Sequence, residues 1–480
     1  MPYKDLREFM EELEGRGLLK RIKKEVDPHL EVTEVLDRAV KARGPAVLFE
    51  RVKGSRFPIV GNLFGTMERV RLALETERLE EAGERLVELL KPEIPTTLVE
   101  KLRTLPKLKE IAAFPPKIVR HGPCQEVIME EPDLSEFPIP QCWPKDGGRY
   151  ITLPLVFTRD PETGERNVGM YRMQVFDSRT TGMHWQIHKH GAEHLRAAGA
   201  RKERLEVAVA LGSDPATIFS AIAPLPKGFD EMLFSGFLRG KGVELVRCKT
   251  VNLEVPAQAE IVLEGYVDPA ELRMEGPFGD HTGFYSPAEP YPVFHLTCIT
   301  HREKPVYPTT IVGKPPMEDG YLGKAVERVF LPLIRLQLPE IVDMNLPIEG
   351  CFHNLCIVSI RKSYPGQAKK VMCALWGLGQ LMFTKAVVVV DHGVNVQDPG
   401  QVLWAVSNLV DPQRDITIIP GAPADSLDQA GPLPNLGSKM GIDATRKGRE
   451  EGVYRDWPEE ITMDEGVKER VEGLWKTLLS

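Results

Sequence analysis

The chain of 480 residues has few of the features that tie a protein to a membrane or to nucleic acid. Its aliphatic runs, such as AVVVV at 386–390, are far shorter than the ~20 apolar residues that cross a bilayer. The N-terminal MPYKDLREFMEELEGRG is charged and amphipathic, and it has no apolar segment of the kind a signal peptide requires. The formal net charge is −8 at pH 7, and no Lys/Arg stripe with interleaved aromatic residues is present. We therefore expect a cytoplasmic protein with no transmembrane segment and no nucleic-acid partner.

The seven cysteines form no CxxC pair, and their number is odd. They are scattered among apolar neighbours, as in Leu-Cys356-Ile and Met-Cys373-Ala. This pattern is typical of reduced, mostly buried thiols in a reducing compartment.

Several common catalytic motifs are absent as well. GYLGKAVERV lacks the spacing of a P-loop and the Ser or Thr after its lysine, and VGNLFGT is not a dinucleotide-binding fingerprint. The chain contains neither a GxSxG elbow nor an HExxH pair. These absences argue against a P-loop NTPase, a nucleophile-elbow hydrolase and an HExxH metalloprotease.

The chain does contain three regions of different character. The first ~110 residues alternate helix and strand patterns, which predicts a small α/β unit. The Pro- and Gly-interrupted segment 107–127 is typical of a domain boundary. Residues 150–310 are rich in strand patterns and turn signals, which predicts a barrel or sandwich. Alternation returns after 320, and the last segment, GVKERVEGLWKTLLS, predicts an amphipathic helix that packs on this body or on a partner subunit.

Four of the eleven histidines and their neighbours gather in MHWQIHKHGAEH, 183–194. If the first part of this segment is a strand, His184, Gln186, His188 and His190 share one face. No cysteine lies nearby and the spacing is not that of a zinc finger, so a structural zinc site is a poor explanation. A structural role is the simpler interpretation for any single histidine, and the clustering weakens it for the group.

Arg172 and Glu244 are charged residues in strand patterns with apolar neighbours. A buried guanidinium needs an acidic partner, so Arg172 either forms a structural ion pair or grips a substrate carboxylate or a catalytic acid. Asn167, Glu244 and one of the histidines would form an oxygen-biased set that suits magnesium or manganese beside a phosphate better than zinc. The sequence alone does not show that they converge.

The stretch EGPFGDHTGFY, 275–285, places Glu275 and Asp280 around a Gly-Pro-Phe-Gly turn. Either the turn is solvated, or it holds one acid at a controlled distance from a second charge.

Many separate segments resemble the UbiD family in order and approximate spacing. They include NVGMYR, MHWQIHKHG, GVELVRC, EIVLEGYV, EGPFGDHTGFY, TTIVGKPPMEDGYLGKA and LGSKMGIDAT, and the resemblance extends from NLFGT at 62 to GIDAT at 445. The family comprises 3-polyprenyl-4-hydroxybenzoate carboxy-lyases of quinone biosynthesis and relatives that use prenylated FMN. Because so many segments match, the resemblance is specific to the family and less specific about the substrate.

The resemblance implies roles for individual residues. Metal ligands correspond to Asn167, Glu244 and a histidine that aligns best with His190, with His188 as the alternative. The metal, usually manganese and sometimes accompanied by potassium, bridges the cofactor phosphate. The segments that surround the prenylated flavin correspond to Met170, Tyr171, Arg172, His184, Trp185, Gln186 and Lys189. The chain departs from the quinone-pathway members at His184, where they have arginine.

The catalytic set implied by the resemblance is Arg172, Glu275 and Asp280. Loss of carbon dioxide from an sp² carbon needs a cofactor as electron sink, and the protein adds a proton donor and a cation. Asp280 would be the donor, and Arg172, held by an ionised Glu275, would set the local charge. Burial or the neighbouring Glu275 is expected to raise the pKa of Asp280. His281 receives no role beyond a supporting hydrogen bond.

The family resemblance also implies an architecture. It consists of an N-terminal α/β domain (1–115), a central split β-barrel like that of flavin reductases with the prenylated-FMN and metal site (116–310), and a C-terminal α/β domain with a terminal oligomerisation helix (311–480). A homodimer or homohexamer is expected, with a flavin prenyltransferase as the cofactor supplier.

The implied function is reversible, non-oxidative decarboxylation of an aromatic or α,β-unsaturated carboxylic acid. The first choice is a 3-polyprenyl-4-hydroxybenzoate-type acid, which would bring the protein to the membrane surface. Alternatives are a decarboxylase of the menaquinone (futalosine) route, a catabolic aryl-acid (de)carboxylase, and a non-catalytic flavin-binding or assembly protein.

Overall fold

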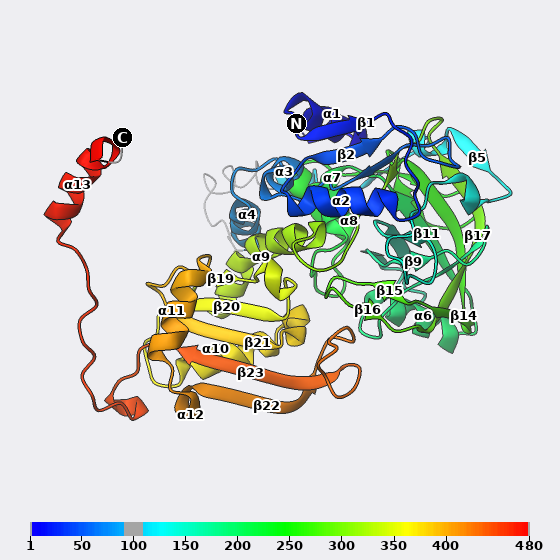
Figure 1. The fold of residues 1–480 in the computed structure, drawn as a ribbon. Coiled ribbons are helices and arrows are strands. Elements are labelled where there is room, and N and C mark those ends of the chain that lie inside the picture. Colours follow the sequence, from blue (N-terminus) through cyan, green and yellow to red (C-terminus); the bar gives the residue numbers. More distant parts are fainter. Residues whose placement is uncertain (1, 91–108, 479–480) are drawn as a thin grey trace, which may run out of the picture.

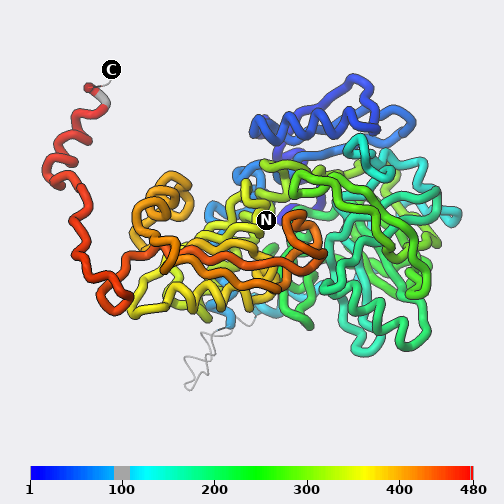
Figure 2. The backbone as a smooth tube through the Cα atoms, turned by 60° about the horizontal axis from the view of Figure 1, so that its bottom comes forward, coloured from blue at the N-terminus to red at the C-terminus, as the bar shows by residue number. Residues whose placement is uncertain are grey.

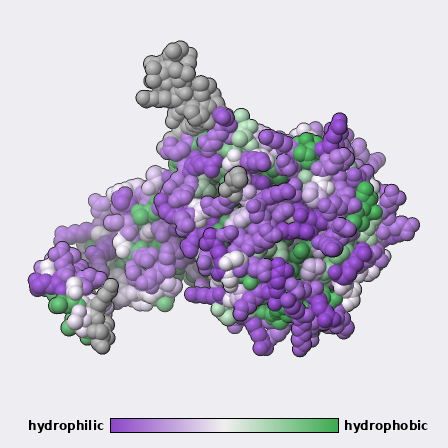
Figure 3. Space-filling view, turned by 90° about the horizontal axis from the view of Figure 1, so that it is seen from above, coloured by the Kyte–Doolittle hydropathy of each residue, from purple (hydrophilic) through white to green (hydrophobic). Residues whose placement is uncertain are grey.

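Residues 2–90 and 109–478 are described by the computed structural model of the chain. The start of the expected boundary segment 107–127 and the end of the expected terminal helix lie outside the described residues. Figure 1 shows the N-terminal elements beside a group of central strands, and the C-terminal sheet in a separate lobe. The face seen in Figure 3 is mostly hydrophilic, with small hydrophobic patches between the polar side chains. None of the helices in the described part of the chain is long and apolar enough to cross a membrane.

The N-terminal α/β unit is confirmed, because helices and strands alternate through it. Its elements are α1 (Leu6–Gly15), β1 (Leu19–Ile22), α2 (Glu31–Lys41), β2 (Ala46–Phe49), β3 (Ile59–Gly61), α3 (Met67–Ala73) and α4 (Glu80–Leu90). Helix α1 starts where the Asp5 side chain accepts hydrogen bonds from two backbone N–H groups, and its apolar residues at helical spacing are buried. The sheet order is β1-β2-β3-β18, where β18 (Tyr307–Pro308) returns from far along the chain.

The central region is built on a seven-stranded antiparallel sheet. Its strands are β5 (Val127–Met129), β7 (Leu155–Arg159), β8 (Arg166–Gly169), β10 (Thr180–Gly182), β11 (Leu205–Leu211), β14 (Ile261–Glu275) and β17 (Glu289–His301). The pairing follows the path β10-β17-β14-β11-β7-β8, with β5 added on β17. The region is rich in strands as expected, while closure into a split barrel stays a prediction.

Smaller elements complete this region. A three-stranded sheet contains β4 (Lys117–Val119), β12 (Glu244–Arg247) and β13 (Glu254–Pro256). Two strand pairs are β6 (Tyr150–Ile151) with β9 (Met173–Gln174) and β15 (Phe278–Gly279) with β16 (Tyr285–Ser286). The helices are α6 (His190–Ala200), α7 (Pro215–Ser220) and α8 (Glu231–Arg239). This region also has two short 3₁₀ turns, η1 (Pro123–Gln125) and η2 (Leu134–Glu136). Three more lie in the C-terminal part of the chain: η3 (Ile348–Gly350), η4 (Gly379–Phe383) and η5 (Arg449–Glu451).

The expected strand through the histidine-rich segment is wrong. Strand β10 ends at Gly182, an irregular stretch follows, and helix α6 begins at His190. The Lys189 N–H donates to the Gln186 carbonyl at 3.0 Å, which turns the chain into the helix. His184, Gln186, His188 and His190 therefore do not share one strand face, because the Ala-rich segment after Lys189 favours helix.

The C-terminal α/β unit is also confirmed. It contains α9 (Glu318–Gln337), β19 (Ile341–Asn345), β20 (Leu355–Ile360), α10 (Gln367–Trp376), β21 (Ala386–Asp391), α11 (Pro399–Leu409), α12 (Pro412–Asp415), β22 (Ile416–Pro423) and β23 (Leu436–Ala444). The sheet order is β19-β20-β21-β23-β22. Two separate apolar clusters take side chains from this sheet, so the run of valines in β21 is buried from both sides.

The last helix, α13 (Glu465–Leu478), stands away from the body at the end of an extended segment, as Figures 1 and 2 both show. Its apolar positions recur at helical spacing, and Val471, Leu474 and Leu478 are 38%, 53% and 63% exposed. The helix therefore does not pack on its own body in the described structure, and packing on a partner subunit stays a prediction.

Candidate active site

The stretch around Glu275 and Asp280 is a short hairpin and not a single tight turn. Glu275 ends β14, and Phe278–Gly279 of β15 pairs with Tyr285–Ser286 of β16. Between them Gly276 has a φ of +108°, and a Cβ there would lie 2.9 Å from the Pro287 carbonyl oxygen. Asp280 follows β15 directly, at the bend of the hairpin.

Two buried side chains, Asp146 and Gln174, support this hairpin through hydrogen bonds to its backbone. Asp146 Oδ1 accepts a hydrogen bond from the Gly279 N–H at 2.8 Å, and Gln174 Oε1 accepts one from the Gly276 N–H at 2.7 Å. Burial raises the pKa of Asp146 to about 6, although its backbone hydrogen bonds oppose the shift. Asp146 and Gln174 are single polar residues in segments without a motif, so the sequence carries no signal for them.

Arg172 lies between the two carboxylates of the hairpin, as the resemblance implied. Its Nε donates to Glu275 Oε1 at 3.0 Å, its Nη2 donates to Glu275 Oε2 at 3.3 Å, and its Nη1 donates to Asp280 Oδ2. The arginine side chain is 9% exposed, and its guanidinium lies over the Phe278 ring at 4.5 Å. The structure thus brings the three predicted catalytic residues together in one buried cluster, which excludes the solvated-turn interpretation.

Glu275 serves a second partner, His184. The imidazole Nδ1 lies 2.8 Å from Glu275 Oε2, and the glutamate side chain is fully buried. Burial alone would raise the pKa of Glu275, but the hydrogen bond from His184 and the charge of Arg172 lower it below its ordinary value. Burial and the Arg172 charge lower the pKa of His184, so the ring is neutral near pH 7. Glu275 is therefore an ionised anchor for both neighbours.

The expected upward shift of the Asp280 pKa is wrong in this arrangement. Burial does act to raise the pKa, but the hydrogen bond from His281 and the charge of Arg172 outweigh it and hold the pKa below its ordinary value. His281 Nδ1 lies 2.9 Å from Asp280 Oδ1, and the His281 N–H donates to the same oxygen at 2.8 Å. Asp280 is a carboxylate here, so it has to receive a proton before it can donate one.

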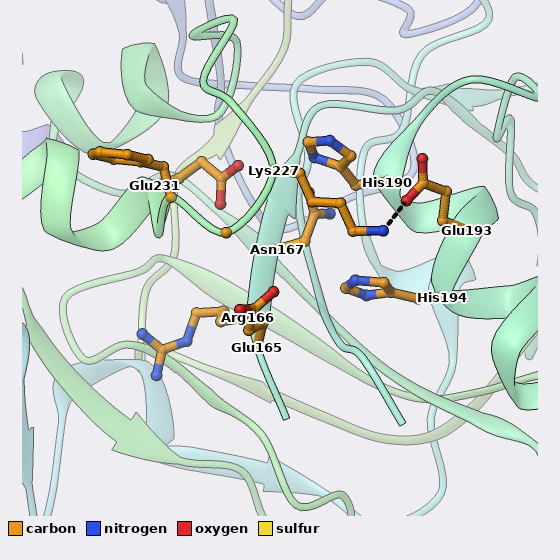
Figure 4. Close-up of a pocket in the computed structure, with 10 residues that line it drawn as sticks. Glu165, Arg166, Asn167, His190, Glu193, His194, Lys227 and Glu231 are labelled. Carbon is orange, nitrogen blue, oxygen red and sulfur yellow. Dashed lines mark hydrogen bonds and ion pairs between the residues drawn. The ribbon is translucent and has the colours of Figure 1, made fainter. Parts of the chain in front are cut away.

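A second group of polar residues, from β8, α6, α8 and the loops beside them, surrounds a pocket shown in Figure 4. Asn167 comes from β8, His190 from the start of α6 and Glu231 from the start of α8. The pocket is lined by Glu165, Arg166, Asn167, His190, Glu193, His194, Lys227, Gly228, Phe229 and Glu231. Lys227 donates to Glu193 Oε2 at 2.8 Å across it.

The prediction that Glu244 joins Asn167 and His190 is contradicted by the structure. Glu244 is exposed at the start of β12, in register with Lys117 of β4, and it does not line the pocket. Glu231 does line the pocket: it is buried, it accepts a hydrogen bond from the Val168 N–H at 2.9 Å, and burial raises its pKa to about 7. Asp230 caps the helix and Glu231, its first residue, faces inward.

The three side chains Asn167, His190 and Glu231 fit a hard divalent cation. The described residues hold no group of three His, Cys, Asp or Glu side chains that could bind a metal, so a metal here would use the Asn167 amide oxygen. Asn167 Nδ2 is buried and has no hydrogen-bond partner among the described residues. An unpaired amide in a polar pocket is the kind of group that a bound ligand satisfies.

Residues expected around the flavin lie in the two chain segments that connect residues of this pocket with residues of the Arg172 cluster, 167–172 and 184–190. Met170 and Tyr171 occupy the irregular stretch between β8 and β9, and Trp185 is buried with its ring perpendicular to that of Tyr171 at 6.3 Å. The Trp185 Nε1 is buried with no partner in the described part of the chain. Gln186 reaches the C-terminal unit, where its Nε2 donates to Ser426 Oγ at 3.2 Å.

Lys189 and the N-terminus of helix α6 are electropositive groups in the same segment of the chain as Trp185 and Gln186. No side chain caps the N-terminus of α6, and burial lowers the pKa of Lys189. Within the described residues the lysine has no carboxylate within ion-pair distance. A lysine next to an uncapped helix N-terminus suits an anionic group such as a phosphate.

Comparisons with known proteins agree along the whole chain. Sequence models of the 3-octaprenyl-4-hydroxybenzoate carboxy-lyase (UbiD) N-terminal, Rift-related and C-terminal domains match residues 10–88, 117–315 and 320–444. An "Uncharacterized protein" of Archaeoglobus fulgidus is 58% identical over 479 residues, which cover 100% of this chain and 99% of the relative.

Solved structures give the same picture. The UbiD-class enzyme HmfF from Pelotomaculum thermopropionicum, in complex with FMN, superposes with a TM-score of 0.82 at 33% identity, covering 97% of this chain and 98% of that one. An evolved dimeric form of HmfF has been solved with prFMN. Vanillic acid decarboxylase of Sedimentibacter hydroxybenzoicus, in its closed form, superposes with a TM-score of 0.87 at 30% identity over the full length of both chains.

Proposed function

Because the chain belongs to the UbiD family of carboxy-lyases, we propose that it decarboxylates an aromatic or α,β-unsaturated carboxylic acid reversibly, without net oxidation, with prenylated FMN as cofactor. The observation that carries the proposal is the buried Arg172 held between Glu275 and Asp280. This cluster offers a cation for a substrate carboxylate and an acid for the carbon that loses it.

The cofactor part of the proposal is supported by the unpaired groups described above. Lys189 and the start of α6 would hold the flavin phosphate, and Asn167, His190 and Glu231 would hold Mn²⁺, with or without K⁺, against it. Met170, Tyr171, Trp185 and Gln186 would line the ring system. When bound, the prenylated flavin supplies the electron sink that no side chain can provide.

The remaining chemistry belongs to residues of the chain itself. Arg172 orients the substrate carboxylate and is kept in place by the ionised Glu275, which is in turn fixed by His184. As the carbon–carbon bond breaks and carbon dioxide leaves, the vacated carbon takes a proton from Asp280. The family resemblance assigns this role to Asp280, and because Asp280 is a carboxylate in this structure, it has to be protonated before it can donate.

For the substrate we propose an aromatic carboxylic acid, with a 3-polyprenyl-4-hydroxybenzoate-type acid tested first. A small aryl acid is the second candidate, because one full-length structural relative is named as a vanillic acid decarboxylase. A decarboxylase of the menaquinone route and a non-catalytic flavin-binding protein remain outcomes of the test.

The finer architecture belongs to the same proposal. The units would be 1–115, 116–310 and 311–480, with the central sheet as a split barrel around the flavin. The exposed apolar face of α13 would dock on a second copy of the chain in a homodimer or homohexamer. A flavin prenyltransferase would supply the cofactor.

The test is co-expression with a flavin prenyltransferase, followed by mass and absorbance measurements of the bound flavin and by metal analysis. The loaded protein is then offered long-chain prenylated hydroxybenzoates and small aryl acids, and both carbon dioxide release and deuterium uptake by the product from D₂O are measured. We expect prenylated FMN, about one Mn²⁺ per chain and turnover of one class of acid. A protein that binds no flavin, or that binds it and turns over no acid, would refute the proposal.

A further inference from the structure

Two histidines from different parts of the chain meet behind Asp280. His281, in the hairpin, and His353, in the loop after η3 of the C-terminal unit, place their Nε2 atoms 2.8 Å apart. The other nitrogen of His281 lies 2.9 Å from Asp280 Oδ1. A continuous chain of polar atoms therefore runs from Asp280 through both imidazoles into the C-terminal unit.

The geometry requires one proton between the two rings, and the surrounding charges decide whether the pair carries an extra one. Two ring nitrogens at 2.8 Å share one proton, because one must donate and the other accept. Nδ1 of His281 faces a carboxylate and donates to it. With the shared proton on His281 this ring is an imidazolium and His353 is neutral, with its remaining proton on Nδ1. That Nδ1 is buried and makes no hydrogen bond with the described residues.

The charges around the pair favour keeping the extra proton on His281. Burial acts to lower the pKa of His281, but the hydrogen bond and charge of Asp280 outweigh it and raise the pKa, with help from the charges of Asp319 and Asp425. Burial and the charge of His281 lower the pKa of His353 to about 4. Asp425 opposes that shift, and Lys189 adds to it.

Asp319, at the start of α9, is the remaining acid that faces the pair. Burial raises its pKa to about 7, the positive charge of His281 acts against this shift, and its Oδ2 has no partner among the described residues. The surroundings of the pair therefore contain both ionised and protonatable acids.

The loop that presents His353 is held in an unusual conformation. Cys351 and Phe352 have φ values of +54° and +46°, a region in which bulky residues are rarely found. Phe352 packs against Gly323 of α9, where a Cβ would lie 2.8 Å from the Phe352 side chain. The backbone is thus constrained so that the His353 ring reaches across to the hairpin.

On the premise of the decarboxylase function proposed above, we propose that the His281–His353 pair stores the proton that Asp280 gives to the substrate carbon. In the step, the Asp280 carboxylate first receives the Nδ1 proton of the His281 imidazolium and then transfers it to the vacated carbon, which returns Asp280 to its carboxylate form. His281 is left neutral, with its remaining proton on Nε2 hydrogen-bonded to His353, and one proton taken up from solvent restores the imidazolium. The balance is one solvent proton gained by the product for each carbon dioxide lost, and no electron leaves the substrate–flavin system.

The experiment uses the full-length, flavin-loaded protein and the variant His353→Gln. Glutamine places an amide near the position of the imidazole Nε2, so it keeps a hydrogen bond to His281 but cannot carry the extra proton. His392→Gln is the matched control, since His392 is exposed in the same C-terminal unit, in the turn after β21. Two quantities are measured: product deuterium exchange in D₂O against pH, and histidine titration by NMR of ¹⁵N-histidine-labelled protein without substrate.

In the wild type we expect two coupled histidine titrations, one above and one below the ordinary value. In His353→Gln we expect the exchange rate to fall at least about tenfold, since a positioned acid–base group typically contributes 10²–10⁴-fold. The pH dependence should also change, while KM and the melting temperature stay near those of the wild type. His392→Gln should behave as the wild type in every assay.

Histidines that titrate independently in the wild type would overturn the inference, and so would a His353→Gln variant with wild-type exchange rate and pH profile. A variant that loses rate and melting temperature together, with an unchanged pH profile, would show a purely structural contact. Absence of exchange in the loaded wild type with every acid would instead refute the proposed function, while the NMR titration would still decide whether the pair shares a proton.

Discussion

Glu275→Gln is the substitution that most directly tests the charge arrangement at Arg172. The carboxylate is fully buried and accepts two hydrogen bonds from Arg172 and one from His184. Hydrogen bonds to charged groups contribute about 1.5–3 kcal/mol each. Arg172 keeps Asp280 and Ser286 as partners, so we expect a net loss of about 3 kcal/mol, at the lower end of the range for breaking a buried ion pair. For a unit of about 200 residues this corresponds to a fall in Tm of roughly 6–12 °C.

The direction of the Glu275 pKa shift determines how the loss of stability in Glu275→Gln depends on pH. The folded-state pKa of Glu275 is lowered, so its contribution is fully present above the unfolded pKa of about 4.3 and is lost as pH falls through the folded value. The Tm difference between wild type and variant should therefore be constant from pH 8 to pH 5 and shrink below about pH 4. The difference is measured by calorimetry on the flavin-free protein at each pH.

Glu289→Gln is the matched control. Glu289 is the register partner of Glu275 on β17, and it is partly exposed. We expect it to change stability by less than about 0.5 kcal/mol. A Glu275→Gln protein as stable as the wild type at pH 7 would refute the argument, because Glu275 would then not be an ionised partner of Arg172.

Three further substitutions test the other parts of the site and the assembly. Asp280→Asn should abolish carbon dioxide release and product deuterium exchange while flavin binding, followed by absorbance, is retained; measurable exchange would exclude Asp280 as the proton donor. Glu231→Gln should lower the Mn²⁺ content of the purified protein at least about tenfold, whereas Glu244→Gln should leave it unchanged, and the reverse result in elemental analysis would restore the assignment made from the sequence. Leu474→Glu on α13 should shift the protein to a smaller species in light scattering, whereas Leu403→Glu, at a leucine on α11 that is even more exposed, should not; an unchanged mass for Leu474→Glu would exclude α13 as the contact.

Local patterns were sufficient to predict the two α/β units. Helix α9 and strand β21 follow from residues 318–337 and 386–391 because each has a strong period of its own. Local patterns could not predict that Tyr307–Pro308 adds β18 to the N-terminal sheet, since this two-residue pairing depends on contacts far apart in the chain. They also misassigned 183–189 as a strand, because alternation of residue types does not reveal where a helix nucleates.

The sequence indicated some residues of the site and not others, and the physical reason differs between residues. Arg172, Glu275 and Asp280 meet because the hairpin after β14 brings Asp280 to the guanidinium that Glu275 also binds, and a resemblance over many segments can indicate such a meeting when spacing cannot. Glu244 was chosen because apolar residues flank it, but in a strand those neighbours face inward and the glutamate points out. Glu231 begins a helix, where an acid is ordinarily explained by the helix dipole, so its inward position gave no local signal.

The protonation state of Asp280 shows why a buried acid cannot be assigned from burial alone. Burial and the neighbouring Glu275 both favour a raised pKa, and these were the two influences that the sequence indicated. In the folded chain the Arg172 guanidinium and the His281 imidazole both stabilise the carboxylate, and together they outweigh burial. A substrate carboxylate that binds the Arg172 guanidinium weakens the contact between Arg172 and Asp280. It also adds a second negative charge near Asp280. Both effects raise the pKa of Asp280. The proton then moves toward Asp280 when an acid occupies the site, and the nearest group that holds one is His281.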